Sequence, residues 1–390
     1  MKYITEINGK GNVALEDTIL YKGIPSTAGS KMLEKFIPLH NAEVVDRLEK
    51  TGYEISGKSN VGEFGFDLLG ETSFFGSEKD ENGNLVSSSS VLVKNGLKGV
   101  LAVELNGASL RGAALGGTVF VKPTYGTVSR YGVIPCACSS EQVGVHASNI
   151  DNAVEILTSI AGHDDKDGTS LTAEKYEYSL SENVCGKKVC IPKEYFEKAD
   201  DKTKKKVLSV AETLKLKGAC VEEVSFSDLL ASQSAWFIMM SAESCNNLSR
   251  YDGVKFGHRA KKYNDIEELY INSRTEAFGL LVKSVILYGS DVLSKNRYFT
   301  AYDKALKVRR ALRKKLDEIF AQYDFVLAPV SSKTEYKEAT LKDVYAESYF
   351  TSLASMMGLP VVATNGVQLI GNTFGESTIF SVAKALEEGK

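Results

Sequence analysis

The sequence predicts an α/β protein in which helices cover a largely buried sheet. Segments with apolar residues at helical spacing alternate with short apolar strands along the whole length. The 390 residues are 43% hydrophobic and 25% charged and include only 7 prolines, a composition typical of an ordered globular chain. Because neither an internal repeat nor a low-complexity linker divides the sequence, we expect one domain over residues 1–390.

The first half of the chain predicts alternating helices and strands. Residues 40–50 carry apolar side chains at helical spacing, and residues 53–60 follow as a strand. Residues 75–84 are charged and rich in glycine and asparagine, which predicts an exposed loop. The remaining elements expected here are a buried strand with a tight turn at 99–109, a capped helix at 149–162 and a strand with a loop at 187–196.

Beyond residue 200 the sequence is mostly helical. We expect helices at 204–218, 230–249, 298–320 and after 377, and short strands at 325–330, 359–364 and 366–371. The helix at 298–320 is rich in lysine and arginine between residues 304 and 315, but Asp303, Asp317 and Glu318 interleave with them. We therefore interpret this segment as a solvated helix face.

Charge and cysteine usage argue against several classes of function. The formal net charge of −3 provides no basic excess for neutralising phosphates, so no direct nucleic-acid partner is expected. No stretch approaches the ~20 apolar residues of a membrane span, and the first residues lack the apolar region of a signal peptide, so we expect a cytoplasmic protein. The six cysteines lack metal-ligand spacing, so we expect reduced thiols, no metal and no cofactor.

The most informative segment covers residues 107–132. Ser109 follows two small residues at the end of an apolar strand, and Arg111 and the small-residue start of a helix come next. Backbone N–H groups around a serine in this position can stabilise an oxyanion. The pattern therefore indicates a nucleophilic serine.

These residues resemble the amidase-signature family, and in particular the A subunits of the tRNA-dependent amidotransferases. The shared segments, in the family's order, are KPTYG at 122–126, SRYGV at 129–133, QVG at 142–144, AGHD at 161–164, NLSRYDGV at 247–254 and GLP at 358–360. The resemblance covers nearly the whole chain. It implies an α/β/α fold, with a mixed central sheet covered by helices on both faces, and a chain that lacks the family's N-terminal segment.

The resemblance also implies a Ser–Ser–Lys triad that hydrolyses an amide. Ser109 matches the nucleophile, and Asn106, Gly107 and Ala108 form the loop that precedes it. The lysine position is occupied by Glu16, a weaker base whose negative charge would oppose an oxyanion. Lys58 matches a different lysine of the family and is expected to hold backbone carbonyls or a carboxylate.

The serine that bridges nucleophile and lysine lies in a glycine-rich loop of the family. Here the run at 87–90 contains four serines and no glycine, which favours a simple polar turn over the family's cis peptide arrangement. Ser87 is the first candidate for the bridging position, and Ser88 is the second.

The residues that anchor glutamine in the family's A subunits are also altered. Ser284 or Val285 stands in place of an arginine, and Ser348 stands in place of an aspartate. Neither serine nor valine can provide the paired donors with which arginine recognises a carboxylate. We therefore expect glutamine recognition of the family type to be absent.

Three functions are compatible with these changes. The first is a non-catalytic protein that binds a partner or a small ligand in the remodelled cleft. The second is an active amide hydrolase, or an amidotransferase A subunit, that uses Ser109 with a base other than lysine. The third is a regulator that competes with an intact A subunit for a B-type or C-type amidotransferase subunit.

Overall fold

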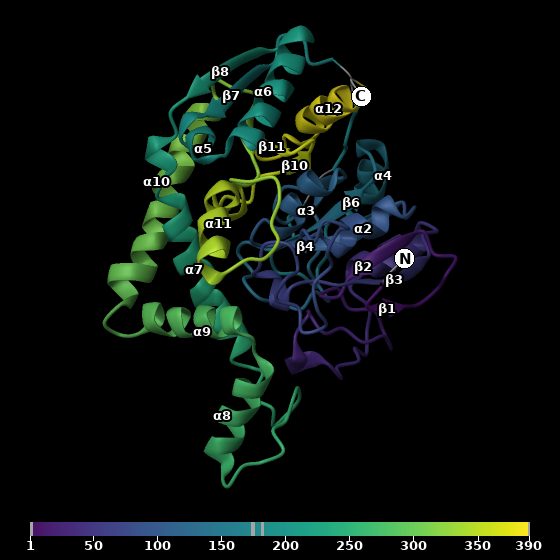
Figure 1. Ribbon diagram of the computed structural model, residues 1–390, viewed down its shortest axis with the longest axis vertical. Coiled ribbons are helices and arrows are strands. Elements are labelled where there is room, and N and C mark those ends of the chain that lie inside the picture. The colour runs from purple at the N-terminus through teal and green to yellow at the C-terminus, as the bar shows by residue number, and fades with distance from the viewer. Residues whose placement is uncertain (1–2, 173–175, 181–182, 389–390) are drawn as a thin grey trace.

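A single sheet of eleven strands organises the molecule (Figure 1). The computed structural model describes residues 3–172, 176–180 and 183–388. The strand order is β1-β3-β2-β4-β6-β5-β10-β11-β9-β7-β8, with parallel and antiparallel neighbours. The strands are β1 (Thr5–Glu6), β2 (Val13–Glu16), β3 (Ile55–Ser59), β4 (Gly99–Glu104), β5 (Val119–Lys122), β6 (Gln142–Ala147), β7 (Lys188–Pro192), β8 (Cys220–Val224), β9 (Phe325–Pro329), β10 (Val361–Thr364) and β11 (Val367–Gly371).

Helices pack on both faces of this sheet. The α-helices of the described residues are α1 (Glu43–Lys50), α2 (Ser88–Lys94), α3 (Ala108–Gly116), α4 (Ile150–Ile160), α5 (Lys193–Lys198), α6 (Asp201–Leu216), α7 (Ser232–Leu248), α8 (Ile266–Ala277), α9 (Leu280–Leu293), α10 (Asp303–Phe320), α11 (Leu341–Met356) and α12 (Glu376–Glu387). A π-helical turn, η4 (Tyr298–Tyr302), precedes α10. Figure 1 shows α8 projecting away from the rest of the molecule.

The alternation of side chains along the strands produces two hydrophobic cores. Leu101 belongs to the core that includes α1, α4, α6 and α12, whereas the next residue, Ala102, belongs to the core that includes α3, α7, α10 and α11. In the same way Leu327 and Val362 face the first core while their neighbours in sequence face the second. This two-residue period is the one that a sheet covered on both faces requires.

The predicted α/β class, with a mixed sheet between two helical layers, is confirmed. The segments expected at 40–50, 53–60, 99–109 and 149–162 contain α1, β3, β4 and α4. Residues 75–84 form the expected loop, since the described structure places no helix or strand there. Two local expectations were wrong: the serine run continues into helix α2 instead of ending in a polar turn, and residues 193–198 form α5 instead of a loop.

No helix in the described ranges is long and apolar enough to cross a membrane.

Helix α11 begins with a capping box that can be tested. The Thr340 hydroxyl accepts the N–H of Asp343, and the Asp343 carboxylate accepts the N–H of Thr340. Because Thr340 is exposed, Thr340→Ala should remove the cap with little loss of packing and lower stability by about 1 kcal/mol. Urea unfolding followed by circular dichroism measures this, and Thr340→Ser should keep most of the stability. An equal loss in both variants would show that the cap is not responsible.

Candidate active site

Ser109 lies in the first turn of α3, immediately after the loop that leaves β4. Gly107 caps this helix with a φ of 85°, and a Cβ atom there would lie 2.6 Å from Arg111 Nη1 and from the Thr351 side chain. Only glycine fits such a position. Ser109 is buried, and its hydroxyl makes no hydrogen bond to any residue that the structure describes. The predicted nucleophile is therefore positioned by a helix start but is not hydrogen-bonded to a base.

The side chain that dominates this helix start is Glu104, at the end of β4. Its carboxylate accepts the N–H groups of Gly107, of Ser109 at 3.1 Å and of Leu110 at 3.2 Å. These are N–H groups that the helix itself cannot satisfy, and groups of this kind bind oxyanions in hydrolases. A carboxylate of the same chain thus occupies donors beside the nucleophile position. We did not predict a role for Glu104 from the sequence.

Two buried cations face the Glu104 carboxylate. Burial raises the pKa of Glu104, and the charges of Lys122 and Arg111 oppose that rise. Burial lowers the pKa of Lys122 to about 8, while the charge of Glu104 opposes the fall. Arg111 Nη2 donates to the carbonyl of Asn106 at 2.6 Å and so holds the loop before the helix. The helix start is therefore fixed by both hydrogen bonds and charge.

Glu16 ends β2 and lies beside β4. The Thr18 hydroxyl donates to Glu16 Oε1 at 2.7 Å, and the N–H of Val103 donates to the same oxygen at 3.3 Å. Burial raises the pKa of Glu16 to about 8, and the charges of Glu104 and Asp17 add to the rise. At neutral pH the side chain is mostly a neutral acid, which accepts hydrogen bonds but cannot act as a general base.

Lys58, on β3, is fully buried and already has partners. Its Nζ donates to the carbonyl of Ile19 at 2.8 Å and to the Ser26 hydroxyl, and it lies 3.5 Å from Asp17 Oδ1. Burial lowers the pKa of Lys58 to about 8, opposed chiefly by the charge of Asp17. These contacts are the ones expected from the sequence, to a backbone carbonyl and a carboxylate.

The serine run forms the start of α2 instead of a catalytic loop. Ser87 is the residue before the helix, and all peptide bonds in the described residues are trans. Its side chain lies against α3, because a Cβ atom on Gly112 would be 2.5 Å from Ser87 Cβ. Ser88 accepts the N–H of Asn60 at 3.2 Å. No hydrogen bond among the described residues joins either serine to Ser109 or Glu16.

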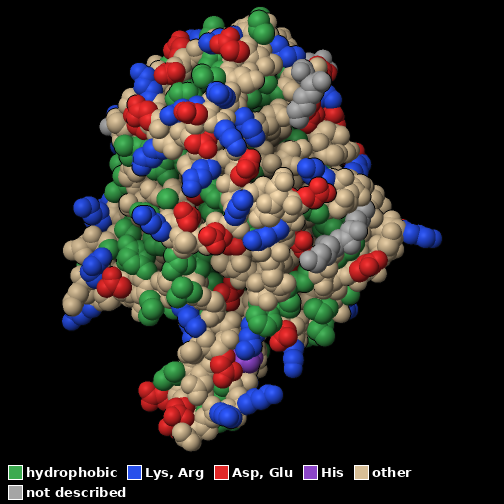
Figure 2. Space-filling model, viewed as in Figure 1, with side chains coloured by type: hydrophobic (Ala, Val, Ile, Leu, Met, Phe, Trp, Pro, Cys, Tyr) green, Lys and Arg blue, Asp and Glu red, His purple; other side chains and the backbone are tan. Residues whose placement is uncertain are grey.

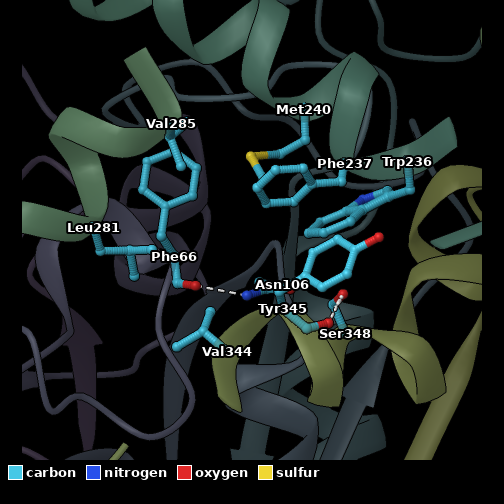
Figure 3. A pocket seen from close by; sticks show the side chains of 10 residues that line it. All are labelled: Phe66, Asn106, Trp236, Phe237, Met240, Leu281, Val285, Val344, Tyr345 and Ser348. Carbon is cyan, nitrogen blue, oxygen red and sulfur yellow. Dashed lines mark hydrogen bonds between the residues drawn. The ribbon is translucent and has the colours of Figure 1, made fainter. Parts of the chain in front are cut away.

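Figure 3 shows a cavity lined by Asn106, which belongs to the loop before α3. Its volume is about 10 Å³, which is room for roughly one water molecule. Apolar side chains of Phe66 and of α7, α9 and α11 fill the surrounding space. The lining residues are Phe66, Asn106, Trp236, Phe237, Met240, Leu281, Val285, Val344, Tyr345 and Ser348.

This cavity brings together three of the positions singled out from the sequence. Asn106 donates to the carbonyl of Phe66 at 2.6 Å, and the Ser348 hydroxyl donates to the carbonyl of Tyr345 at 2.7 Å (Figure 3). Val285 lines the cavity, whereas Ser284 does not and donates to the carbonyl of Leu280 in its own helix. Of the two candidates for the arginine position, Val285 is therefore the one at the cavity.

Comparison with known proteins shows which family shares this sequence and fold. The family model described as "Amidase" matches residues 12–79 and 106–380. The chain belongs to the amidase family. The glutamyl-tRNA(Gln) amidotransferase A subunit of Lachnospira eligens is 36% identical over 97% of this chain and 83% of its own length, and that of Neisseria meningitidis is 35% identical over 96% and 83%. The crystal structure of the corresponding A subunit from Thermotoga maritima superposes with a TM-score of 0.81 at 28% identity, covering 100% of this chain and 86% of that one.

The resemblance predicted from the sequence is thus confirmed. The unmatched segment inside this amidase-family chain, residues 80–105, contains both Ser87 and Glu104. This segment, which the family model does not match, contains the serine run that folds as α2 and the strand β4, which ends at the buried Glu104.

The protonation of Glu16 predicts how stability depends on pH. Its folded-state pKa of about 8 lies above the ~4.3 of an unfolded glutamate, so the stability contributed by the protonated form is full below pH ~4 and is lost as the pH rises to 8. That loss is on the order of 4 kcal/mol. Glu16→Gln keeps an acceptor for Thr18 and Val103 but cannot ionise. Between pH 5 and pH 8 the wild-type chain should therefore lose stability relative to Glu16→Gln.

Urea midpoints at pH 5, 6, 7 and 8 measure the difference between the two chains. Glu34→Gln, on an exposed loop, is the matched control for removal of one carboxylate. A difference between wild type and Glu16→Gln that stays constant over this range would contradict the buried neutral acid.

Proposed function

We propose that this chain is a non-hydrolytic member of the amidase family that acts by binding a B-type or C-type amidotransferase subunit. The observation that carries the first part is the Glu104 carboxylate on the N–H groups of Gly107, Ser109 and Leu110. Losing one oxyanion donor costs a hydrolase ~10²–10³ in rate. Losing a triad member costs ~10⁴ or more, and Glu16 stands at the lysine position.

The small volume of this cavity supports the same proposal. Small-molecule sites usually enclose ~300–1,000 Å³, whereas the space beside Asn106 is about 10 Å³. Val285 and Ser348 provide neither a positive charge nor a carboxylate at the two positions where the resemblance expects substrate anchors. A substrate like glutamine therefore lacks both room and recognition.

The relatives of this chain and its exposed hydrophobic side chains both support the proposed binding to another subunit. The curated relatives are by name the A subunits of an amidotransferase, and so are parts of a larger enzyme. Many large hydrophobic side chains that this chain leaves exposed lie between residues 254 and 299. They are Val254, Phe256, Tyr263, Ile266, Tyr270, Ile271, Leu280, Leu287, Tyr298 and Phe299.

The centre of this exposed group is the outer side of α9 and η4. Leu287 is 72% exposed and Phe299 is 73% exposed. Figure 2 shows hydrophobic side chains gathered over α9 and the neighbouring ends of α7 and α10. Exposed apolar patches mark interaction sites, and a partner that buries this one would need no catalysis from this chain.

The chemical part is tested by a serine-reactive fluorophosphonate. Wild-type protein should gain no adduct in intact-protein mass spectrometry, because Ser109 has no base and its neighbouring N–H donors are engaged. Ser109→Ala is the control for labelling at other sites, and the Lachnospira eligens relative is the positive control. An adduct on wild type that disappears in Ser109→Ala would overturn the proposal and favour an active hydrolase with another base. The double variant Glu16→Lys with Glu104→Ser asks whether labelling can be restored.

The partner is tested by co-purification with B-type and C-type subunits from the same genome. We expect a complex on size-exclusion chromatography that Leu287→Ser with Phe299→Ser weakens at least tenfold, since a few residues buried at the centre of an interface carry most of its binding energy. Leu208→Ser with Leu216→Ser changes two leucines on α6 that are 45% and 88% exposed, and it should leave the complex intact. Absence of a complex, or equal weakening by both pairs, would contradict this partner surface.

A further inference from the structure

A second, open cleft lies beside the basic helix α10, away from the residues of the amidase site. Its volume is about 600 Å³. One face of α10 and the end of α11 form its lining, and no acidic side chain is among the lining residues. These are Leu306, Arg309, Arg310, Arg313, Lys314 and Met357.

The cations of this cleft are largely uncompensated. Arg309, Arg310 and Lys314 form no ion pair with any residue that the structure describes. Arg313 is held in place, because its Nε lies 3.0 Å from Asp317 Oδ1 and its Nη1 donates to the Thr373 hydroxyl at 3.1 Å. Although the formal net charge of the chain is −3, positive charge is concentrated in this cleft.

The spacing along α10 explains why these side chains converge. Residues 306, 309, 310, 313 and 314 follow the three- and four-residue spacing of one helix face. The neighbouring face packs into the core through Ala305, Leu312 and Leu316. The sequence had indicated only a solvated face here, since the contribution of Met357 from another helix is not visible in the order of residues.

The arginine and lysine side chains that line the cleft favour an anionic ligand. Arginine forks bind phosphate and carboxylate oxygens in pairs, and the volume lies in the range of small-molecule sites. Leu306 and Met357 add an apolar surface for the carbon part of a ligand. A nucleic-acid backbone requires a longer basic track, and Asp303, Asp317 and Glu318 interrupt the charge on both sides of the cleft.

We propose that this cleft binds a small organic ligand with two or more closely spaced anionic groups, either phosphoryl or carboxylate. A second basic groove, of about 610 Å³ beside Met32 and Phe256, is less suited to an anion. Glu34 is among its lining residues, and Glu276 lies 2.7 Å from His258, so acidic groups offset its positive charge.

Isothermal titration with pyrophosphate and with citrate tests the site and separates the two sources of negative charge. We expect one ligand per chain for at least one of the two probes, with an affinity that falls as salt is raised. Arg310→Glu with Lys314→Glu should weaken binding at least roughly tenfold, since each reversal places a repulsive charge in the cleft.

Lys304→Glu with Lys307→Glu is the matched control. It changes the net charge of the same helix equally but alters no lining residue. Arg310→Gln with Lys314→Gln, followed by a thermal melt, covers the case in which the charge-reversed chain does not fold. Equal weakening by the lining and control pairs would show non-specific attraction and overturn the site, as would the absence of binding of either probe at millimolar concentration.

Discussion

The arrangement around Ser109 depends on one buried carboxylate. Glu104 joins the end of β4 to the first turn of α3 through three backbone N–H groups, and the left-handed Gly107 makes that turn possible. A buried acid of this kind is tolerated only when donors or cations surround it. Lys122 and Arg111 are the cations, and both are fully buried. The contact that shapes the helix start therefore also sets the charge of its surroundings.

The same principle extends along the neighbouring strands. Lys58 on β3, Glu16 at the end of β2, Glu104 at the end of β4 and Lys122 at the end of β5 are all buried. In the order of the sheet, the two strands that carry the glutamates, β2 and β4, lie between the two that carry the lysines, β3 and β5. Hydrogen bonds to backbone groups satisfy each side chain. The ionisable side chains in the interior of this half of the sheet are thus stabilised by backbone hydrogen bonds, and Glu16 also by being mostly protonated at neutral pH.

Most of the fold could be predicted from the sequence, because the two-residue and helical periods of apolar residues are local signals. The family could be predicted as well, since its motifs recur in order over most of the chain. Two features of the site could not. Glu104 has no motif, and its meaning depends on N–H groups that face it only after α3 forms. The cavity is closed by side chains of α7, α9 and α11, which are far apart in sequence, so spacing alone cannot reveal its size.

The filled cavity also has a consequence for evolution. A residue that touches a substrate is constrained by its chemistry, whereas Leu281, Val285 and Val344 belong to a hydrophobic core and line a cavity of about 10 Å³. Interiors of this kind tolerate exchange among aliphatic residues when total volume is kept. If the proposed non-hydrolytic role is correct, descendants of this sequence are free to vary at these positions in ways that a hydrolytic member of the family is not, while Gly107 and Glu104 remain fixed by geometry.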